Sequence, residues 1–159
     1  MLKNFKTDLE NAKSAERLVQ QIFSELTNCY EFVDVSEDRS CYSLGDIKAI
    51  EKTTGREIFI EVKDDSRIAD TRNILCEEEV YYKESDYSVK GNMYNNSDIY
   101  CVVSKSERKI YVLDFKILQQ NRRKGFFKVI RHPQQESDCY LLPLCFAKRF
   151  GALITILDY

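Results

Sequence analysis

The chain has 159 residues, of which 43% are apolar, and its 24 Lys and Arg nearly balance 26 Asp and Glu. This is typical of one globular domain, here residues 1–159. The 5 Gly and 2 Pro exclude collagen-like and linker-rich classes, and no apolar run is long enough to predict a membrane span. The first residues lack the apolar segment of a signal peptide, so we expect a cytoplasmic protein with no membrane partner.

Side chains suited to soft metals or to nucleophilic catalysis are scarce. The 6 Cys form no CxxC pair, and His132 is the single histidine. A zinc site needs close Cys pairs or Cys and His clusters, and a Ser-His-Asp arrangement would depend on His132 without any GxSxG turn. We therefore expect the cysteines to be small buried residues, and any chemistry to use carboxylates, lysine and a hard metal ion.

The first predicted element is a helix that Thr7 or Asp8 caps. Its apolar residues recur every three or four positions from Leu9 to Leu26, which places them on one helical face. Glu16 lies inside this stripe. A buried carboxylate is costly unless it is paired, hydrogen-bonded or metal-bound; the alternative is a residue at the stripe's edge that reaches water or pairs with Lys13 or Arg17.

A strand over residues 30–35 and a hairpin over residues 41–63 follow. Gly55 supplies the turn between the two arms of the hairpin. Side chains of a strand alternate between faces, so Glu61 and Lys63 project side by side from one face. Folding about the turn brings Asp46 opposite residues 60–61. We therefore expect Asp46 and Glu61 to meet across the hairpin.

The rest of the chain predicts a mixture of helices and strands. The expected elements are a helix at 71–83, a polar loop or edge at 84–97, strands at 98–103 and 109–115, a helix at 116–123, a strand at 126–131, a loop at 133–138 and a closing helix at 146–157. This order favours an α/β domain whose central mixed sheet is flanked by helices.

Three carboxylates and one lysine converge in this scheme. Glu16, Asp46 and Glu61 offer the oxygen ligands that Mg2+ or Mn2+ takes, and such an ion polarises a phosphoryl oxygen and activates water. Lys63 stabilises charge or orients the water, and we expect its surroundings to lower its pKa. The pattern therefore points to phosphodiester hydrolysis.

This arrangement resembles the PD-(D/E)XK nuclease superfamily. Gly45-Asp46 matches its first motif, with Gly in place of Pro, and Glu61-Val62-Lys63 matches its (D/E)-x-K motif. Over residues 8–103 the resemblance implies a restriction-endonuclease-like αβββαβ core, followed by C-terminal additions. It also implies that Glu16, Asp46 and Glu61 are catalytic metal ligands, that the Val62 carbonyl is an extra ligand, and that Lys63 is the catalytic lysine.

Two segments carry residue types that contact phosphates. The first offers Arg67, Thr71, Arg72 and Asn73 at the start of the predicted helix at 71–83; the alternative is a capped helix entrance with a solvated Arg67. The second is the basic run Arg122, Arg123 and Lys124, beside two aromatic residues that could stack on bases; its alternative is a basic helix end followed by a core strand. Residues 81–159 carry 13 Lys and Arg against 8 Asp and Glu, which suits a polyanion.

The first functional hypothesis is a Mg2+- or Mn2+-dependent nuclease acting on DNA. One such domain holds one site, so cutting both strands of a duplex would require a homodimer, whereas nicking or end processing would not. The second hypothesis is a catalytically silent member that binds nucleic acid or protein. The third is a nuclease inhibitor or other accessory protein without a site. The nuclease hypothesis is favoured because all four residue types that the motif requires are present, at Glu16, Asp46, Glu61 and Lys63.

Overall fold

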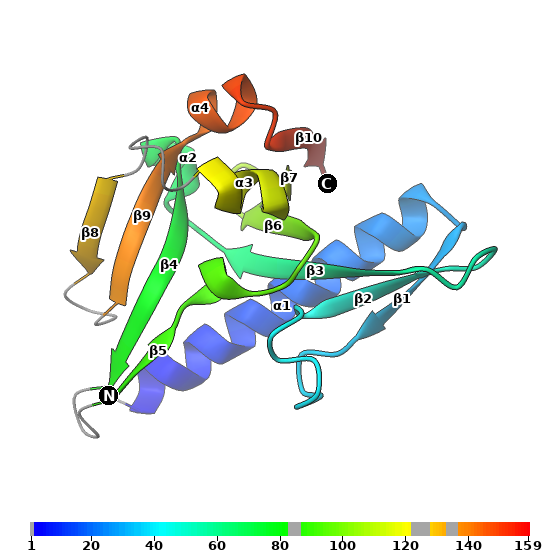
Figure 1. Ribbon diagram of the computed structural model, residues 1–159, viewed down its shortest axis with the longest axis horizontal. Coiled ribbons are helices and arrows are strands. Elements are labelled where there is room, and N and C mark those ends of the chain that lie inside the picture. Colours follow the sequence, from blue (N-terminus) through cyan, green and yellow to red (C-terminus); the bar gives the residue numbers. More distant parts are fainter. Residues whose placement is uncertain (1, 83–86, 122–127, 133–136) are drawn as a thin grey trace.

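The computed structural model describes residues 2–82, 87–121, 128–132 and 137–159 (Figure 1). Its elements in chain order are α1 (Leu2–Leu26), β1 (Tyr30–Asp34), β2 (Ile47–Glu51), β3 (Glu57–Asp64), α2 (Ile68–Thr71), β4 (Asn73–Tyr82), β5 (Tyr87–Lys90), the 3-10 turn η1 (Asn92–Tyr94), β6 (Ile99–Ser104), β7 (Lys109–Asp114), α3 (Phe115–Asn121), β8 (Lys128–His132), β9 (Ser137–Pro143), α4 (Leu144–Arg149) and β10 (Leu153–Asp158). The α/β class is confirmed.

A mixed six-stranded sheet forms the centre of the fold, in the order β1-β2-β3-β6-β7-β10. Strands β1 to β3 form an antiparallel meander, β6 lies parallel to β3, and β7 and β10 continue antiparallel. The predicted hairpin at 98–115 is therefore confirmed. The one at 41–63 is confirmed only from Ile47 onward, because residues 41–44 form turns instead of the start of its first arm. Gly55 has a φ of 71° in the turn between its arms. A parallel pair requires a crossover connection, which here runs from β3 to β6.

Helix α1 covers one face of this sheet (Figure 1). Ala15 and Val19 are fully buried against Ile60, Val62 and the same-face residues of the neighbouring strands. The helix begins earlier than predicted, so Thr7 and Asp8 lie inside it rather than capping it. The two ends of the predicted stripe are not buried, since Leu9 and Leu26 are exposed.

A second sheet occupies the crossover, where the sequence pattern predicts a helix. Residues 73–82 form β4 within the order β5-β4-β9-β8, so the predicted helix at 71–83 is wrong. Only the single turn α2 is helical there. The triple Glu77-Glu78-Glu79 favours a helix locally, but hydrogen bonds to β9, which lies more than fifty residues further along the chain, form the strand.

The second core lies between the central sheet and the second sheet. Tyr100 and Tyr111 on the central strands pack with Ile74, Leu142 and Phe115, all fully or almost fully buried. Strands β3 and β6 therefore bury both faces, one against α1 and the other toward β4 and β9. The face that carries Glu61 and Lys63 is the second, since Glu61 lies beside Tyr100 in the parallel register.

The C-terminal prediction is half correct. α4 is helical as expected, but Gly151, with a φ of 77°, ends it. Residues 153–158 form the edge strand β10 instead of continuing the helix. The predicted strand at 126–131 corresponds to β8 where it is described. Among the described residues, no helix has the length and apolar character needed to cross a membrane.

Candidate active site

Asp46 lies at the start of β2, opposite Glu61 on β3. The register Ile47 to Ile60 extends one step to this pair, and two hydrogen bonds hold it. The Asp46 amide donates to the Ile60 carbonyl at 2.9 Å, and the Val62 amide donates to Asp46 Oδ2 at 2.8 Å. The two bonds flank Glu61 on either side. The structure therefore confirms the predicted meeting of Asp46 and Glu61 across the hairpin.

Gly45 makes this close approach possible. Its φ is 141°, a conformation that L side chains rarely adopt, and a Cβ there would lie 2.8 Å from the backbone oxygen of Ile60. The glycine therefore allows the close approach of Asp46 to β3. It also lets the chain bend from the turn at residues 41–44 into β2.

Burial and mutual repulsion raise the pKa values of both carboxylates. Burial raises the pKa of Asp46 to about 6, the Val62 hydrogen bond opposes this shift, and the charge of Glu16 adds to it. Burial raises the pKa of Glu61 to about 8, and the charges of Asp46 and Glu77 add to the shift. At neutral pH Glu61 therefore holds a proton in the metal-free protein. A cation placed at this pair would relieve both effects.

Lys63 lies two residues beyond Glu61 on the same face of β3, as predicted. Its Nζ is 2.9 Å from Glu77 Oε1 on β4, forming a partly buried ion pair. Burial acts to lower the pKa of Lys63, but the charge and hydrogen bond of Glu77 outweigh it, so the pKa is raised. Our expectation of a lowered pKa is therefore wrong. The physical reason is Glu77, which the sequence analysis placed on a helix.

Glu16 is almost entirely buried, at 7% exposure. Its Oε2 atom lies 3.4 Å from Lys13 Nζ and makes no hydrogen bond. The predicted alternative of pairing with Lys13 is thus the contact observed, while the pairing with Arg17 is absent from the ion pairs of the described residues. The Glu16 charge still reaches the site, because it raises the pKa of Asp46. The pKa of Asp46 is therefore sensitive to Glu16, and the pKa of Glu61 is sensitive to Asp46.

Asn95 is a site residue that sequence reasoning missed. Its Nδ2 donates to Glu61 Oε2 at 2.8 Å, and Gln119 Nε2 holds the Asn95 carbonyl at 2.8 Å. The preceding turn η1 is anchored by Asn92, whose Oδ1 accepts from the Glu77 amide at 3.0 Å. The Asn-rich segment was expected to be a loop, and its composition carries no signal that one amide would reach Glu61.

The donor atoms at Asp46 and Glu61 fit Mg2+ or Mn2+ in kind. Both are carboxylates, and Mg2+ in proteins commonly uses one or two carboxylates with water and substrate oxygens. The Val62 N–H faces Asp46, so its carbonyl points to the same edge of β3. Within the described ranges, however, no three His, Cys, Asp or Glu side chains are grouped closely enough to hold an ion. Asp46 and Glu61 are therefore the two side chains that suit the ion, and Glu16 does not form a three-residue group with them.

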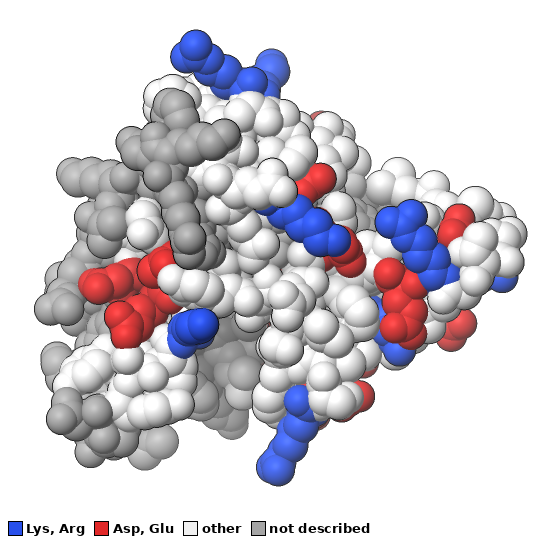
Figure 2. Space-filling view, viewed as in Figure 1, with Lys and Arg blue, Asp and Glu red and all other residues white. Residues whose placement is uncertain are grey.

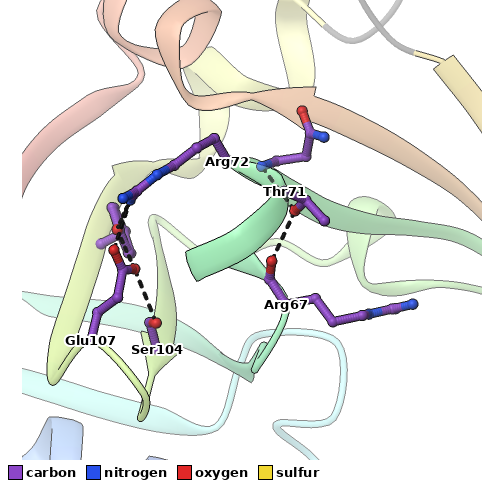
Figure 3. Close-up of polar contacts among 7 residues, drawn as sticks. Arg67, Thr71, Arg72, Ser104 and Glu107 are labelled. Atoms are coloured by element: carbon purple, nitrogen blue, oxygen red, sulfur yellow. Dashed lines mark hydrogen bonds and ion pairs between the residues drawn. The ribbon is translucent and has the colours of Figure 1, made fainter.

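The predicted phosphate-binding residues separate into two groups (Figure 3). Arg72 reaches Glu107 Oε1 at 2.7 Å and the Tyr111 hydroxyl at 3.3 Å, so its guanidinium is part of a local network. Arg67 extends away from that network, as Figure 3 shows, and lines a cavity with Thr71 and Asn73. The helix α2 is a single turn and residues 73–82 form a strand, so these residues do not begin the predicted helix at 71–83, and their contact with phosphate stays a prediction. Arg122, Arg123 and Lys124 lie outside the described residues.

The face seen in Figure 2 has no continuous basic surface among the described residues. Acidic side chains gather over the second sheet at the left of this view, and the Lys and Arg side chains lie in small separate groups across the face. Figure 2 therefore adds no support from the described residues for an extended polyanion surface on this face. The basic excess of residues 81–159 includes the run at 122–124, which is not described.

Comparison of the chain with protein-family models, with curated proteins and with solved structures finds no match. The functional interpretation therefore rests on the geometry of Asp46, Glu61, Lys63 and their partners.

Proposed function

We propose that this chain is a Mg2+- or Mn2+-dependent nuclease that hydrolyses phosphodiester bonds of DNA. One observation carries the proposal: Asp46 and Glu61 lie opposite each other on neighbouring strands. The Val62 amide donates a hydrogen bond to Asp46, and Lys63 follows Glu61 on the same face of β3. The pKa values of both acids are raised by burial and by neighbouring charge. Perturbed carboxylates beside a lysine are a common feature of catalytic sites. The restriction-endonuclease-like core is part of this proposal.

Asp46 and Glu61 would hold the ion, with the Val62 carbonyl at the same edge. When bound, Mg2+ polarises a phosphoryl oxygen and lowers the pKa of a coordinated water. Glu61 must release its proton as the cation arrives, because a ligating carboxylate is ionised. Lys63 keeps its proton, since Glu77 raises its pKa. Its role is to stabilise negative charge on the phosphate rather than to act as a base.

Asn95 and Glu77 orient these groups. The Asn95 amide fixes one oxygen of Glu61, which leaves the other oxygen to face Asp46 or an ion. Glu77 fixes the Lys63 ammonium at 2.9 Å. Both supports come from segments between β3 and β6, so the crossover positions the site as well as connecting the strands.

The alternative is a catalytically silent protein of the same architecture that binds nucleic acid or protein. Two observations favour it. Glu61 and Lys63 already have partners in Asn95 and Glu77, and Glu16 faces Lys13 instead of the carboxylate pair. A silent protein could keep these contacts for stability alone. The two functions differ in one respect that can be measured, namely metal-dependent cleavage.

The deciding experiment incubates the protein with plasmid DNA and with labelled DNA and RNA oligonucleotides, in Mg2+, in Mn2+ and in EDTA. The proposal expects cleavage in either metal and none in EDTA. Lys63→Met should abolish it, whereas Lys48→Met should not, since Lys48 pairs with Glu57 at an exposed position. Metal-independent cleavage, or cleavage that survives Lys63→Met, contradicts the proposal.

A further variant separates the two interpretations of Glu16. Glu16→Gln keeps the shape of the side chain and removes its charge. If Glu16 joins the ion, cleavage falls by orders of magnitude, because a ligand charge is lost. If Glu16 serves only Lys13, cleavage stays within a few-fold of the wild type. The plasmid assay in Mg2+ distinguishes these results, and a thermal melt in EDTA checks that the variant folds.

A further inference from the structure

A cavity of about 100 Å³ opens between the second sheet and the segment that follows β3. One wall is apolar and comes from the second sheet: Leu75, Cys139 and Leu141. Leu75 and Cys139 are buried. The opposite wall is polar and comes from the segment that follows β3, where Asp65 is buried and Arg67 is exposed. An apolar cleft with a few convergent polar groups is the usual form of a small-ligand site.

The register places this cavity directly next to the candidate active site. Asp65 follows Lys63 by two residues, and Leu75 precedes Glu77 by two on the same face of β4. Cys139 lies opposite Glu77, and Leu141 lies opposite Leu75. Same-face neighbours along a strand are separated by about 6.6–6.8 Å. The cavity therefore begins one side-chain step from the ammonium that the proposed function places at the reacting phosphate.

Local hydrogen bonds hold the polar wall in place. The Arg67 amide donates to Asp65 Oδ1 at 3.0 Å, and the Thr71 hydroxyl donates to the Arg67 carbonyl at 3.0 Å. The Asn73 amide donates to Thr71 Oγ1 at 3.2 Å. In Figure 3 the Arg67 side chain extends away from the Arg72–Glu107 contact. The cavity wall is therefore built before any ligand arrives, with a cation at its rim.

We propose that this cavity is a subsite for one unstacked nucleotide next to the cleaved phosphate. The inference rests on the proposed nuclease function. A base would lie against Leu75 and Leu141, with its polar edge toward Asp65 and Asn73, and Arg67 would contact the adjoining phosphate. This cavity, of about 100 Å³, is smaller than the apolar cavity of about 150 Å³ that encloses a benzene ring, so it would receive part of a single ring, with the rest of the base outside its mouth. The subsite favours a pyrimidine over a purine.

This subsite narrows the substrate class. A base inside a duplex cannot enter a cavity without leaving the stack, which costs a few kcal/mol and is least costly for a base that is already single-stranded. The protein should therefore act on single-stranded DNA, frayed ends or flaps in preference to an intact duplex. The preference comes from the second sheet, because β4 and β9 form the apolar wall.

Binding in EDTA tests the subsite apart from catalysis. Fluorescence anisotropy is measured with oligo(dT), oligo(dA) and a blunt duplex of matched length, each about eight nucleotides per strand. We expect oligo(dT) to bind more tightly than oligo(dA) and than the duplex. Arg67→Ala should weaken oligo(dT) binding about tenfold. Leu141→Trp, which fills the cavity, should remove the preference for dT over dA. Arg56→Ala, at the far end of the hairpin, is the matched control.

The outcomes separate the two proposals. Equal binding of all three ligands, or wild-type affinities in both Arg67→Ala and Leu141→Trp, overturns the subsite. Binding that follows the expected pattern without any cleavage in Mg2+ supports the subsite and overturns the nuclease. Cleavage of single-stranded DNA that neither variant alters supports the nuclease and overturns the subsite. Arg67 is exposed, so its variant is expected to fold; thermal melts check both variants.

Discussion

Two carboxylates on neighbouring parts of the fold have opposite electrostatic surroundings. Glu107, after β6, accepts hydrogen bonds from Tyr111 at 2.8 Å, Ser104 at 3.1 Å and Arg72 at 2.7 Å. Burial acts to raise its pKa, but these three donors outweigh burial and lower it. Glu61, on β3, has one amide donor and faces Asp46 and Glu77, and its pKa is raised to about 8.

The difference distinguishes a compensated structural contact from the carboxylate pair that we propose holds a metal ion. The Glu107 network has its charge compensated within the chain, so it requires no ligand and ties α2 to the β6–β7 hairpin. At the Asp46–Glu61 pair, burial and the neighbouring carboxylates oppose ionisation and raise both pKa values, so ionising the pair costs stability. Carboxylates with pKa values perturbed in this way are concentrated at sites that bind ligands or perform catalysis. Three predictions test this contrast.

The largest expected effect is the loss of cleavage in Asp46→Asn. The amide oxygen of Asn can still accept from the Val62 amide, so the fold should persist, while the charge that would hold the ion is gone. We expect Mg2+-dependent cleavage to fall by at least about 10²-fold. The matched control is Glu57→Gln at the exposed start of β3, which should cleave like the wild type. Equal losses in both variants would contradict the contrast.

The next effect is a pH dependence of stability in the metal-free protein. Glu61 ionises near its ordinary pKa of 4.5 when unfolded but near about 8 when folded. Between these values the folded state binds the extra proton, so the free energy of unfolding falls as pH rises from about 5 to 8. Glu61→Gln should flatten this dependence. Denaturant melts in EDTA at several pH values measure it; a wild-type stability that rises across this window contradicts the raised pKa.

The smallest effect concerns the compensated network. Arg72→Ala removes an exposed ion pair, so we expect a loss of about 0.5–1 kcal/mol, or about 1–4 °C in Tm for a chain of this size, with metal-dependent cleavage intact. Arg72 also has a positive φ of 55°, a conformation that favours glycine. Arg72→Gly should therefore be less destabilising than Arg72→Ala. Thermal melts compare the two, and a loss of cleavage in Arg72→Ala would place the network in the site.

The sequence predicted those parts of the fold that local contacts decide. The alternation of residues 57–63 and the turn at Gly55 are enough to place Asp46 opposite Glu61, because a hairpin's register follows from its turn. The predicted helical stripe, which includes Val19, likewise identifies part of the face that α1 buries. The residues at the centre of the candidate site, Asp46, Glu61 and Lys63, were found in this way.

The parts that failed depend on distant partners. Residues 73–82 contain β-branched and aromatic residues that suit a strand and three consecutive Glu that suit a helix. Only pairing with β9 decides between them, and that strand was not predicted. Glu77 was consequently missed as the partner of Lys63, and the pKa of Lys63 was predicted in the wrong direction. Asn95 was missed because nothing local marks the amide that reaches Glu61.

Calorimetric titration with Mn2+ tests the central claim most directly, because it measures whether Asp46 and Glu61 hold a cation without requiring any substrate. The account predicts binding by the wild type, weaker at pH 6 than at pH 8, since Glu61 must lose its proton. It predicts no measurable binding by Asp46→Asn and wild-type binding by Glu57→Gln. Equal Mn2+ affinity in the wild type and Asp46→Asn would contradict the account.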